Sequence, residues 1–220
     1  TGEDFWIEIN ASPVFSDDGK LRHYITSSRD TTARRQLRET HETSLKVEKK
    51  RKDERRLLSQ ISEWLYSSKS LDELLRVIQK SLHTLMPEMR GQLFVYSNSR
   101  DVLDLLTSWG GADDTSHIDV DDCWSLRRGR AYSYGTKSIE FSCQHVANDG
   151  VDSPYFCLPI IAHGQTNGLL HLRFQPQALA DFSPEKKAEY LKQRWQLALI
   201  CAEQISLALA NVQLRQELLD

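Results

Sequence analysis

The alternation of apolar and polar positions predicts two short strands at the start of the chain. Residues 5–9 alternate in their second half, Ser16–Gly19 forms an Asp-Gly turn, and residues 21–25 form the return strand. The Asp-Gly pair favours a hairpin because glycine adopts positive φ without steric cost. A two-stranded hairpin is only marginally stable in water. We therefore expect this segment to need further strands or a neighbouring chain.

A long helix is predicted from about Thr31 to Ser67, because this stretch lacks Gly and Pro and Asp30 precedes it as a cap. Its middle, residues 46–56, has seven basic and three acidic side chains. Opposite charges four residues apart, and the lack of aromatic residues between them, favour a solvated helix over a nucleic-acid or lipid patch. The apolar residues keep a loose heptad register: Leu37, Val47, Leu58, Ile61 and Leu65.

The middle of the chain changes from a helical to a two-residue period. A helix is predicted from Ser70 to Pro87, with an apolar face of Leu71, Leu74, Leu75, Ile78, Leu82 and Leu85. A short helix at Cys123–Gly129, capped by Asp122, follows an acidic loop that begins at Gly110. Strands are predicted at 92–96, 102–106, about 141–146, 155–161 and, after a turn at Gly164–Gly168, 169–174. Strands between helices predict an α+β fold with an antiparallel sheet of five or six strands.

The last helix is predicted from Pro184 to the end of the chain, because proline favours the first helical turn. Its apolar residues follow alternating steps of three and four, which is typical of a coiled-coil or bundle seam. A second apolar face carries Tyr190, Leu197, Cys201 and Ala208, so one face can cover the sheet while the other meets a partner helix. We expect the seam to form a dimer helix through Leu191, Trp195, Ala198, Ala202, Ile205, Leu209 and Val212, and to continue to Leu219.

Composition excludes several classes of protein. The chain has 220 residues, a formal net charge of −3 and a mean hydropathy of −0.51. A near-neutral charge argues against nucleic-acid binding, and we expect neither a membrane span nor a secretory signal. The first residue is Thr, so we expect a piece of a longer protein. Four cysteines without a CxxC pair indicate a reducing, cytoplasmic setting rather than a disulfide framework.

Residues 3–39 resemble the last strands of a PAS domain and its exit into a signalling helix. The matching pieces are Asp4-Phe5-Trp6, Ser12-Pro13-Val14, Asp18-Gly19 and Arg29–Arg35. The resemblance covers only the C-terminal third or so of such a domain and implies a partial PAS β-hairpin.

Residues 57–212 resemble a GAF domain over their whole length. The matching pieces are Asp122–Arg130, Cys143-Gln144-His145, Tyr155–Ile160 and Gly168–Leu172, and this combination is similar to the GAF domains that precede GGDEF domains in bacterial diguanylate cyclases. The resemblance implies a GAF-like sheet, long signalling helices at both ends, a small-ligand pocket and a parent that makes cyclic di-GMP. The expected divisions are 1–32 (PAS fragment), 33–56 (signalling helix), 57–212 (GAF domain) and 213–220 (start of a connector to an output domain).

The implied pocket has an unknown ligand, and no cofactor is identified. The spaced pattern of cyclic-nucleotide-binding GAF domains is missing, and Gln144 separates Cys143 from His145, unlike the adjacent pair of bilin-binding members. Arg127 or Arg128 would grip an anion beside an aromatic wall formed by Trp124. The alternatives are that Trp124 is a core residue and that the arginines are solvated or paired with Asp121 or Asp122.

The cysteine thiols are the other candidates for a functional role. Cys143 and His145 would share a face of a strand, and with Cys123 and Cys157 they would make a Cys₃His zinc site. These spacings are not a known zinc signature, so no metal is favoured and packed core thiols are preferred. A redox role, similar to that of the GAF-type free-methionine-sulfoxide reductases, is the third interpretation of Cys123 and Cys143.

These expectations combine into a dimeric sensory module without catalytic residues of its own. The homodimer would form through the terminal helices and relay a ligand signal to a C-terminal output domain, with no nucleic-acid or membrane partner. A diguanylate cyclase is the expected parent and a sensor histidine kinase the alternative. Two rival interpretations are a thiol-dependent redox enzyme and a purely structural dimerisation module.

Overall fold

A computed structural model describes residues 5–97, 99–111, 115–136, 139–149, 153–162 and 164–218. Asp4 of the PAS resemblance and Leu219 of the predicted seam lie outside these ranges. The chain forms two compact units, Thr1–Arg56 and Leu57–Asp220, which we describe separately.

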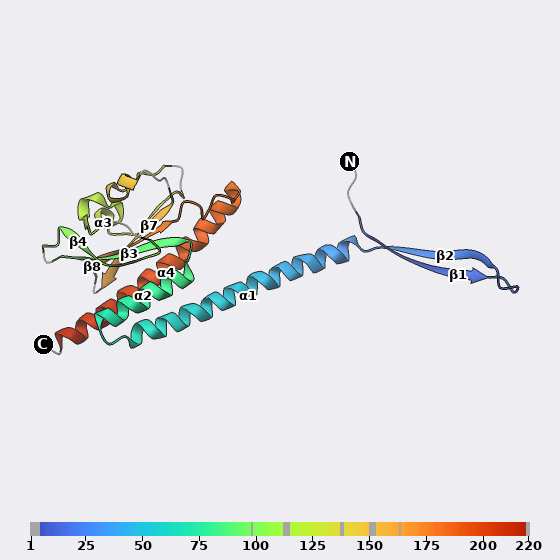
Figure 1. The fold of residues 1–220 in the computed structure, drawn as a ribbon, viewed down its shortest axis with the longest axis horizontal. Coiled ribbons are helices and arrows are strands. Elements are labelled where there is room, and N and C mark those ends of the chain that lie inside the picture. The colour runs from blue at the N-terminus through green and yellow to red at the C-terminus, as the bar shows by residue number, and fades with distance from the viewer. Residues whose placement is uncertain are drawn as a thin grey trace. The chain divides into compact units, whose positions relative to one another are not determined.

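The first unit contains the predicted hairpin and the start of the long helix, and both are confirmed (Figure 1). Strands β1 (Ile7–Phe15) and β2 (Leu21–Asp30) pair antiparallel around the Asp-Gly turn. Helix α1 (Thr32–Ser67) follows, and the Asp30 carboxylate accepts a hydrogen bond from the Thr32 amide at 2.9 Å. The large apolar side chains of the hairpin are exposed, as expected for two strands without further partners.

The second unit is built around a six-stranded antiparallel sheet, which confirms the predicted fold class. In spatial order its strands are β5 (His117–Asp119), β4 (Val102–Trp109), β3 (Met89–Tyr96), β8 (Gln165–Phe174), β7 (Tyr155–Ala162) and β6 (Tyr132–Tyr134). The two short strands at the edges, β5 and β6, were not predicted. Each has only three residues, too few for a visible two-residue period.

The prediction of a strand at 141–146 is wrong, because residues 144–149 form the 3₁₀-helix η2 (Gln144–Asp149). Tyrosine hydroxyls occupy backbone groups in the segment before η2. The Tyr132 hydroxyl donates to the Phe141 carbonyl at 2.7 Å, and the Tyr155 hydroxyl accepts from the Cys143 amide at 2.6 Å. Side-chain partners of this kind give the segment an alternative to a strand ladder.

The turn before the last strand is shorter than predicted. Strand β8 already begins at Gln165, and only Gly164 keeps a positive φ of 76°. Gly168 lies inside the ladder, opposite Val95 on one side and Ile160 on the other. Gly168 is therefore required for a close approach between strands rather than for a turn.

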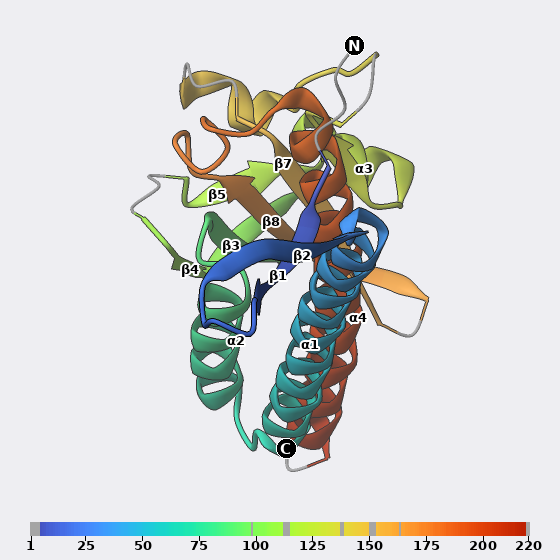
Figure 2. The same ribbon diagram turned by 90° about the vertical axis from the view of Figure 1, so that its right-hand side faces the viewer.

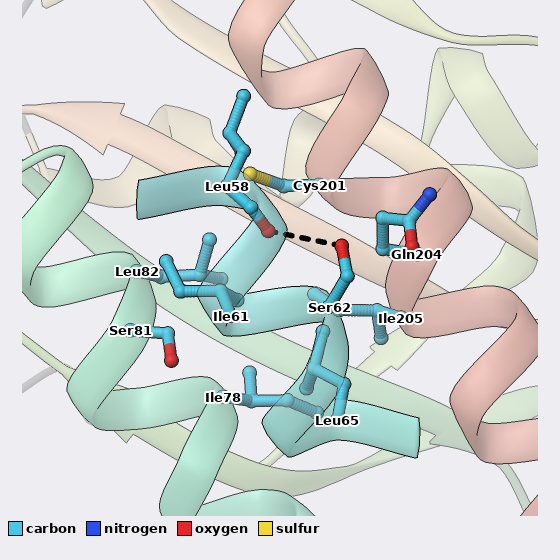
Figure 3. A pocket seen from close by; sticks show the side chains of 10 residues that line it. All are labelled: Leu58, Ile61, Ser62, Leu65, Ile78, Ser81, Leu82, Cys201, Gln204 and Ile205. Carbon is cyan, nitrogen blue, oxygen red and sulfur yellow. Dashed lines mark hydrogen bonds between the residues drawn. The ribbon is translucent and has the colours of Figure 1, made fainter. Parts of the chain in front are cut away.

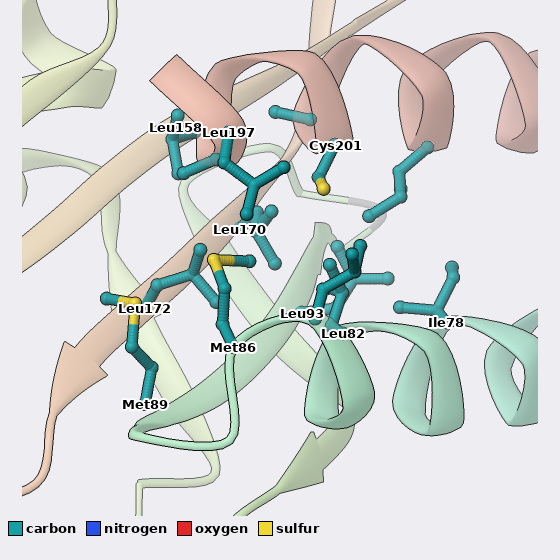
Figure 4. Packing of buried hydrophobic residues seen from close by; sticks show 14 of the residues in the cluster. Ile78, Leu82, Met86, Met89, Leu93, Leu158, Leu170, Leu172, Leu197 and Cys201 are labelled. Carbon is teal, nitrogen blue, oxygen red and sulfur yellow. The ribbon is translucent and has the colours of Figure 1, made fainter. Parts of the chain in front are cut away.

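Helices cover one face of this sheet and form its main core (Figures 1 and 2). They are α2 (Leu71–Leu85) and α4 (Pro184–Glu217), and the end of α1 from Leu57 adds Ile61 and Leu65 to the same core. Figure 4 shows Leu82 and Met86 at one side of this core, Leu197 and Cys201 at the other, and sheet residues such as Leu170 between them. Both helix starts are confirmed, because Ser70 and Ser183 accept hydrogen bonds from Glu73 and Lys186.

The residues predicted to form a dimer seam on α4 are instead buried within their own chain. Six of its seven residues are at most 5% exposed and lie in the core of their own chain, and half-buried Trp195 packs on Phe156 with ring centroids 5.2 Å apart. Leu197, Cys201 and Ala208 are buried with them. An apolar stripe at helical spacing marks a buried face, but it does not say whether the sheet or a second chain covers that face.

By length and composition alone, Pro184–Gln216 would qualify to cross a membrane, and 56% of its most apolar window is buried inside the protein. A helix that covers a sheet in a protein core passes the same test.

The cap of α2 gives a first prediction. Replacing Ser70 with Ala removes the acceptor for the Glu73 amide, 3.3 Å away, and is expected to cost about 1 kcal/mol of unfolding free energy. Urea denaturation followed by tryptophan fluorescence measures this loss. Ser70→Asp, which keeps a capping oxygen, is the control and should retain most of the stability. Equal midpoints for all three proteins would contradict the role of the cap.

Candidate functional site

The sheet face opposite α2 and α4 carries a second, smaller core. Short helices and loops cover it, including the 3₁₀-helix η1 (Val120–Asp122) and helix α3 (Trp124–Arg128). Because neighbouring strand residues point to opposite faces, Tyr155 and Cys157 of β7 belong to this second core, while Phe156 and Leu158 face the helices. The buried members are Phe94, Leu103, Ile118, Cys123, Leu126, Cys143, Val146, Tyr155, Cys157 and Leu169.

Four potential metal ligands converge in this core from separate segments. Cys123 lies between η1 and α3, Cys143 and His145 lie at the start of η2, and Cys157 lies on β7. Their ligand atoms all lie within 4.8 Å of one another. The three cysteines are buried and His145 is half-buried. We call these four residues the thiol–histidine cluster.

Nitrogen atoms approach two of the sulfurs of the cluster. The Trp124 amide donates to Cys143 Sγ at 3.4 Å. Cys157 Sγ lies 3.6 Å from His145 Nε2 and 3.4 Å from Nδ1 of His171, which is buried on β8. The Trp124 amide, as a donor at this distance, stabilises negative charge on the Cys143 sulfur.

Hydrogen bonds among the thiols of the cluster shift their pKa values in different directions. Hydrogen bonds from the Cys123 and Cys157 thiols hold the pKa of Cys143 well below its usual range. The hydrogen bond between Cys123 and Cys143 raises the pKa of Cys123 to about 12. Burial raises the pKa of Cys157. Burial also lowers the pKa of His171, which keeps its imidazole neutral.

The structure does not bring the remaining predicted pocket residues into this cluster. Arg127 and Arg128 are exposed, and the Arg127 guanidinium stacks over the Trp124 ring at 4.5 Å. Trp124 is half-buried beside Phe141, with ring centroids 6.0 Å apart. The side chains of Arg127 and Arg128 both reach solvent, so the prediction that one of them binds an anion in the pocket stays untested.

The predicted cap of the short helix is also corrected. Asp122 belongs to η1, and Cys123 occupies the N-cap position of α3 without a side-chain cap bond. The predicted end is confirmed, because Gly129 follows α3 with a left-handed φ of 59°. Two adjoining short helices fix the backbone on both sides of Cys123, and the Arg127 amide donates to its carbonyl at 3.0 Å.

Two residues of the site were missed from the sequence. His171 lies directly opposite Cys157 in the β7–β8 register, and its ring meets the ring of His145 edge-on at 5.2 Å. Tyr155 holds the Cys143 amide through its hydroxyl, 12 residues away in the chain. The available signal was a lone histidine in an otherwise apolar strand, Leu169–Leu172.

The cluster supports three kinds of chemistry. Three thiol groups and an imidazole match the ligand set of a structural zinc ion. Two neighbouring thiols can also form a disulfide, and a thiolate is a nucleophile. The three sulfur-bearing residues are 0% exposed, so a substrate would need an opening to reach them.

Comparisons with known proteins identify the fold class. No family model matches the sequence, and no curated protein matches it significantly. Among solved structures, the A. aeolicus nlh2 GAF domain in an inactive state is similar, with 14% identity and a TM-score of 0.54 over 71% of this chain and 94% of that one. The unit from Leu57 therefore has the GAF fold, as the resemblance implied.

Two further similar structures come from different functional settings. One is the GAF domain of an Acinetobacter phosphoenolpyruvate-protein phosphotransferase, with 16% identity and a TM-score of 0.52 over 72% of this chain and 93% of that chain. The other is free methionine-R-sulfoxide reductase from Neisseria meningitidis, with 18% identity and a TM-score of 0.51 over 70% and 89%. At these identities the similarity concerns the fold alone.

Proposed function

We propose that the Leu57–Asp220 unit is a sensory and regulatory GAF module of a signal-transduction protein. The observation that carries this proposal is the shared core of the end of α1 and helix α4, which begin and end this unit. Ile61 and Leu65 of α1 share one buried cluster with Cys201 and Ile205 of α4. A displacement of one helix therefore reaches the other through packed side chains.

A small cavity lies at the junction of these helices (Figure 3). The cavity that remains between them measures about 10 Å³ and is lined by residues of α1, α2 and α4, including Leu58, Ile78 and Gln204. This is about the space of one water molecule. The Arg215 guanidinium also donates to the Ser68 carbonyl at 3.4 Å, which ties α4 to the connection between α1 and α2.

A homodimer is part of this proposal, with an interface that differs from the predicted seam. Ile200, Leu207 and Leu214 are 42%, 48% and 43% exposed and lie seven positions apart on α4. At about 100° per residue, this stripe lies on the side of α4 opposite the buried seam. A seven-residue apolar repeat suits a parallel helix from a second copy of the chain.

The dimer gives a second prediction. Leu207→Glu places a charge in the middle of the stripe on both copies and is expected to weaken dimerisation about a hundredfold, since each lost leucine contact contributes about 1.5 kcal/mol or more. Sedimentation velocity over a range of concentrations measures the change. Leu199→Glu makes the same substitution about 80° around the helix and should have a smaller effect. A wild-type chain that stays monomeric at high concentration contradicts the dimer.

The finer proposal concerns the parent protein and rests on the sequence resemblance. We propose that the module regulates a C-terminal diguanylate cyclase that makes cyclic di-GMP, in the cytoplasm, and a sensor histidine kinase is the alternative. The test is the full-length protein with GTP, with and without Leu207→Glu. Cyclic di-GMP formation that falls severalfold in the variant supports the relay, whereas equal rates in the two proteins overturn it. ATP-dependent autophosphorylation without cyclic di-GMP indicates the kinase.

A further inference from the structure

The thiol–histidine cluster has the composition and spacing of a closed zinc site. Zn–S and Zn–N bonds of about 2.3 and 2.0–2.1 Å place tetrahedral ligand atoms about 3.5–3.8 Å from one another. Cys157 Sγ and His145 Nε2 are 3.6 Å apart, and all pairs of ligand atoms lie within 4.8 Å. Small side-chain movements would bring the four atoms to ideal distances.

Packing alone does not explain this arrangement. A buried cysteine that serves as a small apolar residue has no need of other thiols around it. Here three sulfurs and an imidazole meet, although they come from a helix cap, a 3₁₀-helix and a strand. The thiols hydrogen-bond to one another, and one divalent cation would bind all four groups at once.

The surroundings of the cluster suit thiolate ligands. Three thiolates around Zn²⁺ leave one net negative charge, which calls for donors in the next layer. The Trp124 amide donates to Cys143 Sγ at 3.4 Å, and His171 Nδ1 lies 3.4 Å from Cys157 Sγ. Groups of this kind orient metal ligands and tune their basicity in known metal sites.

We propose that Cys123, Cys143, His145 and Cys157 bind one structural Zn²⁺ ion in a tetrahedral Cys₃His site. The ion would join the loops on this face of the sheet to β7, and the four protein ligands would leave no open coordination position for catalysis. This inference does not depend on the dimer or on the identity of the output domain.

The test is the metal content of the whole chain, purified under reducing conditions without a chelating column. We expect one zinc per chain by elemental analysis, and Co²⁺ exchange should give the intense visible absorption of a tetrahedral thiolate site. Cys143→Ser should lose both signals. Cys201→Ser is the matched control, because Cys201 is also buried but belongs to the core on the helical face of the sheet, and it should keep both signals.

A second variant covers the case in which Cys143→Ser fails to fold. His145 is the half-buried ligand, so His145→Ala should fold and bind Zn²⁺ at least tenfold more weakly, measured by competition with a chromogenic chelator. The proposal is overturned if the reduced wild-type chain binds neither Zn²⁺ nor Co²⁺, or if His145→Ala binds as well as the wild type. It is also overturned if the chain, isolated without added oxidant, carries a disulfide between cluster cysteines, detected as a mass lower by two hydrogens.

Discussion

Replacing Gly168 with alanine is expected to destabilise the GAF unit by about 3 kcal/mol or more, the upper end of overpacking effects. A Cβ atom at this position would lie 2.2 Å from the Phe94 carbonyl oxygen. That oxygen belongs to the backbone of β3, so no side-chain rotation relieves the clash. The central pair of strands, β3 and β8, would have to separate.

Urea denaturation of the purified variant measures this effect. Gly164→Ala is the matched control, because Gly164 has a positive φ of 76° but open space around its Cβ position. The control should lose about 1 kcal/mol from backbone conformation alone. If Gly168→Ala loses no more than Gly164→Ala, the close approach of the two strands is contradicted.

Truncating Phe156 to alanine is expected to cost about 3–5 kcal/mol, which is the usual range for a buried phenylalanine. Phe156 is 0% exposed on the helical face of β7. Its ring packs edge-on against Phe174 and Trp195, with centroids 5.7 and 5.2 Å away. The substitution leaves a cavity between the sheet and α4 that these rigid neighbours cannot fill.

Phe141→Ala is the control for this experiment. The Phe141 side chain is 64% exposed, and its backbone bonds to the Tyr132 hydroxyl survive the change, so the loss should stay below about 1 kcal/mol. Comparable losses of unfolding free energy for the two variants would contradict a stabilising role of the Phe156 ring in the core. The unfolding midpoints of both proteins, measured side by side, decide this.

Helices and long strands could be predicted from the sequence because their signals are local. Ser70 and Ser183 mark helix starts through the residues that follow them, and the period of α2 identifies its buried face. The strand at 141–146 was wrong because its backbone partners are the hydroxyls of Tyr132 and Tyr155, which are distant in the chain. Local periodicity carries no information on such partners.

The candidate site was predictable in its residues but not in its geometry. Cys123, Cys143, His145 and Cys157 were recognised as a possible set, and only the folded chain shows their ligand atoms within 4.8 Å. His171 was missed because its importance comes from the β7–β8 register, which places it beside Cys157. The seam of α4 shows the same limit, since its pattern identifies an apolar face without identifying what covers that face.

The alternation of side chains along β7 has a consequence for communication within the domain. Cys157, in the thiol–histidine cluster, and Phe156, against Trp195 of α4, share a peptide bond although they lie on opposite faces of the sheet. A shift of the β7 backbone at Cys157 must therefore also move the Phe156 ring. The thiols and helix α4 are separated by the thickness of the sheet at β7.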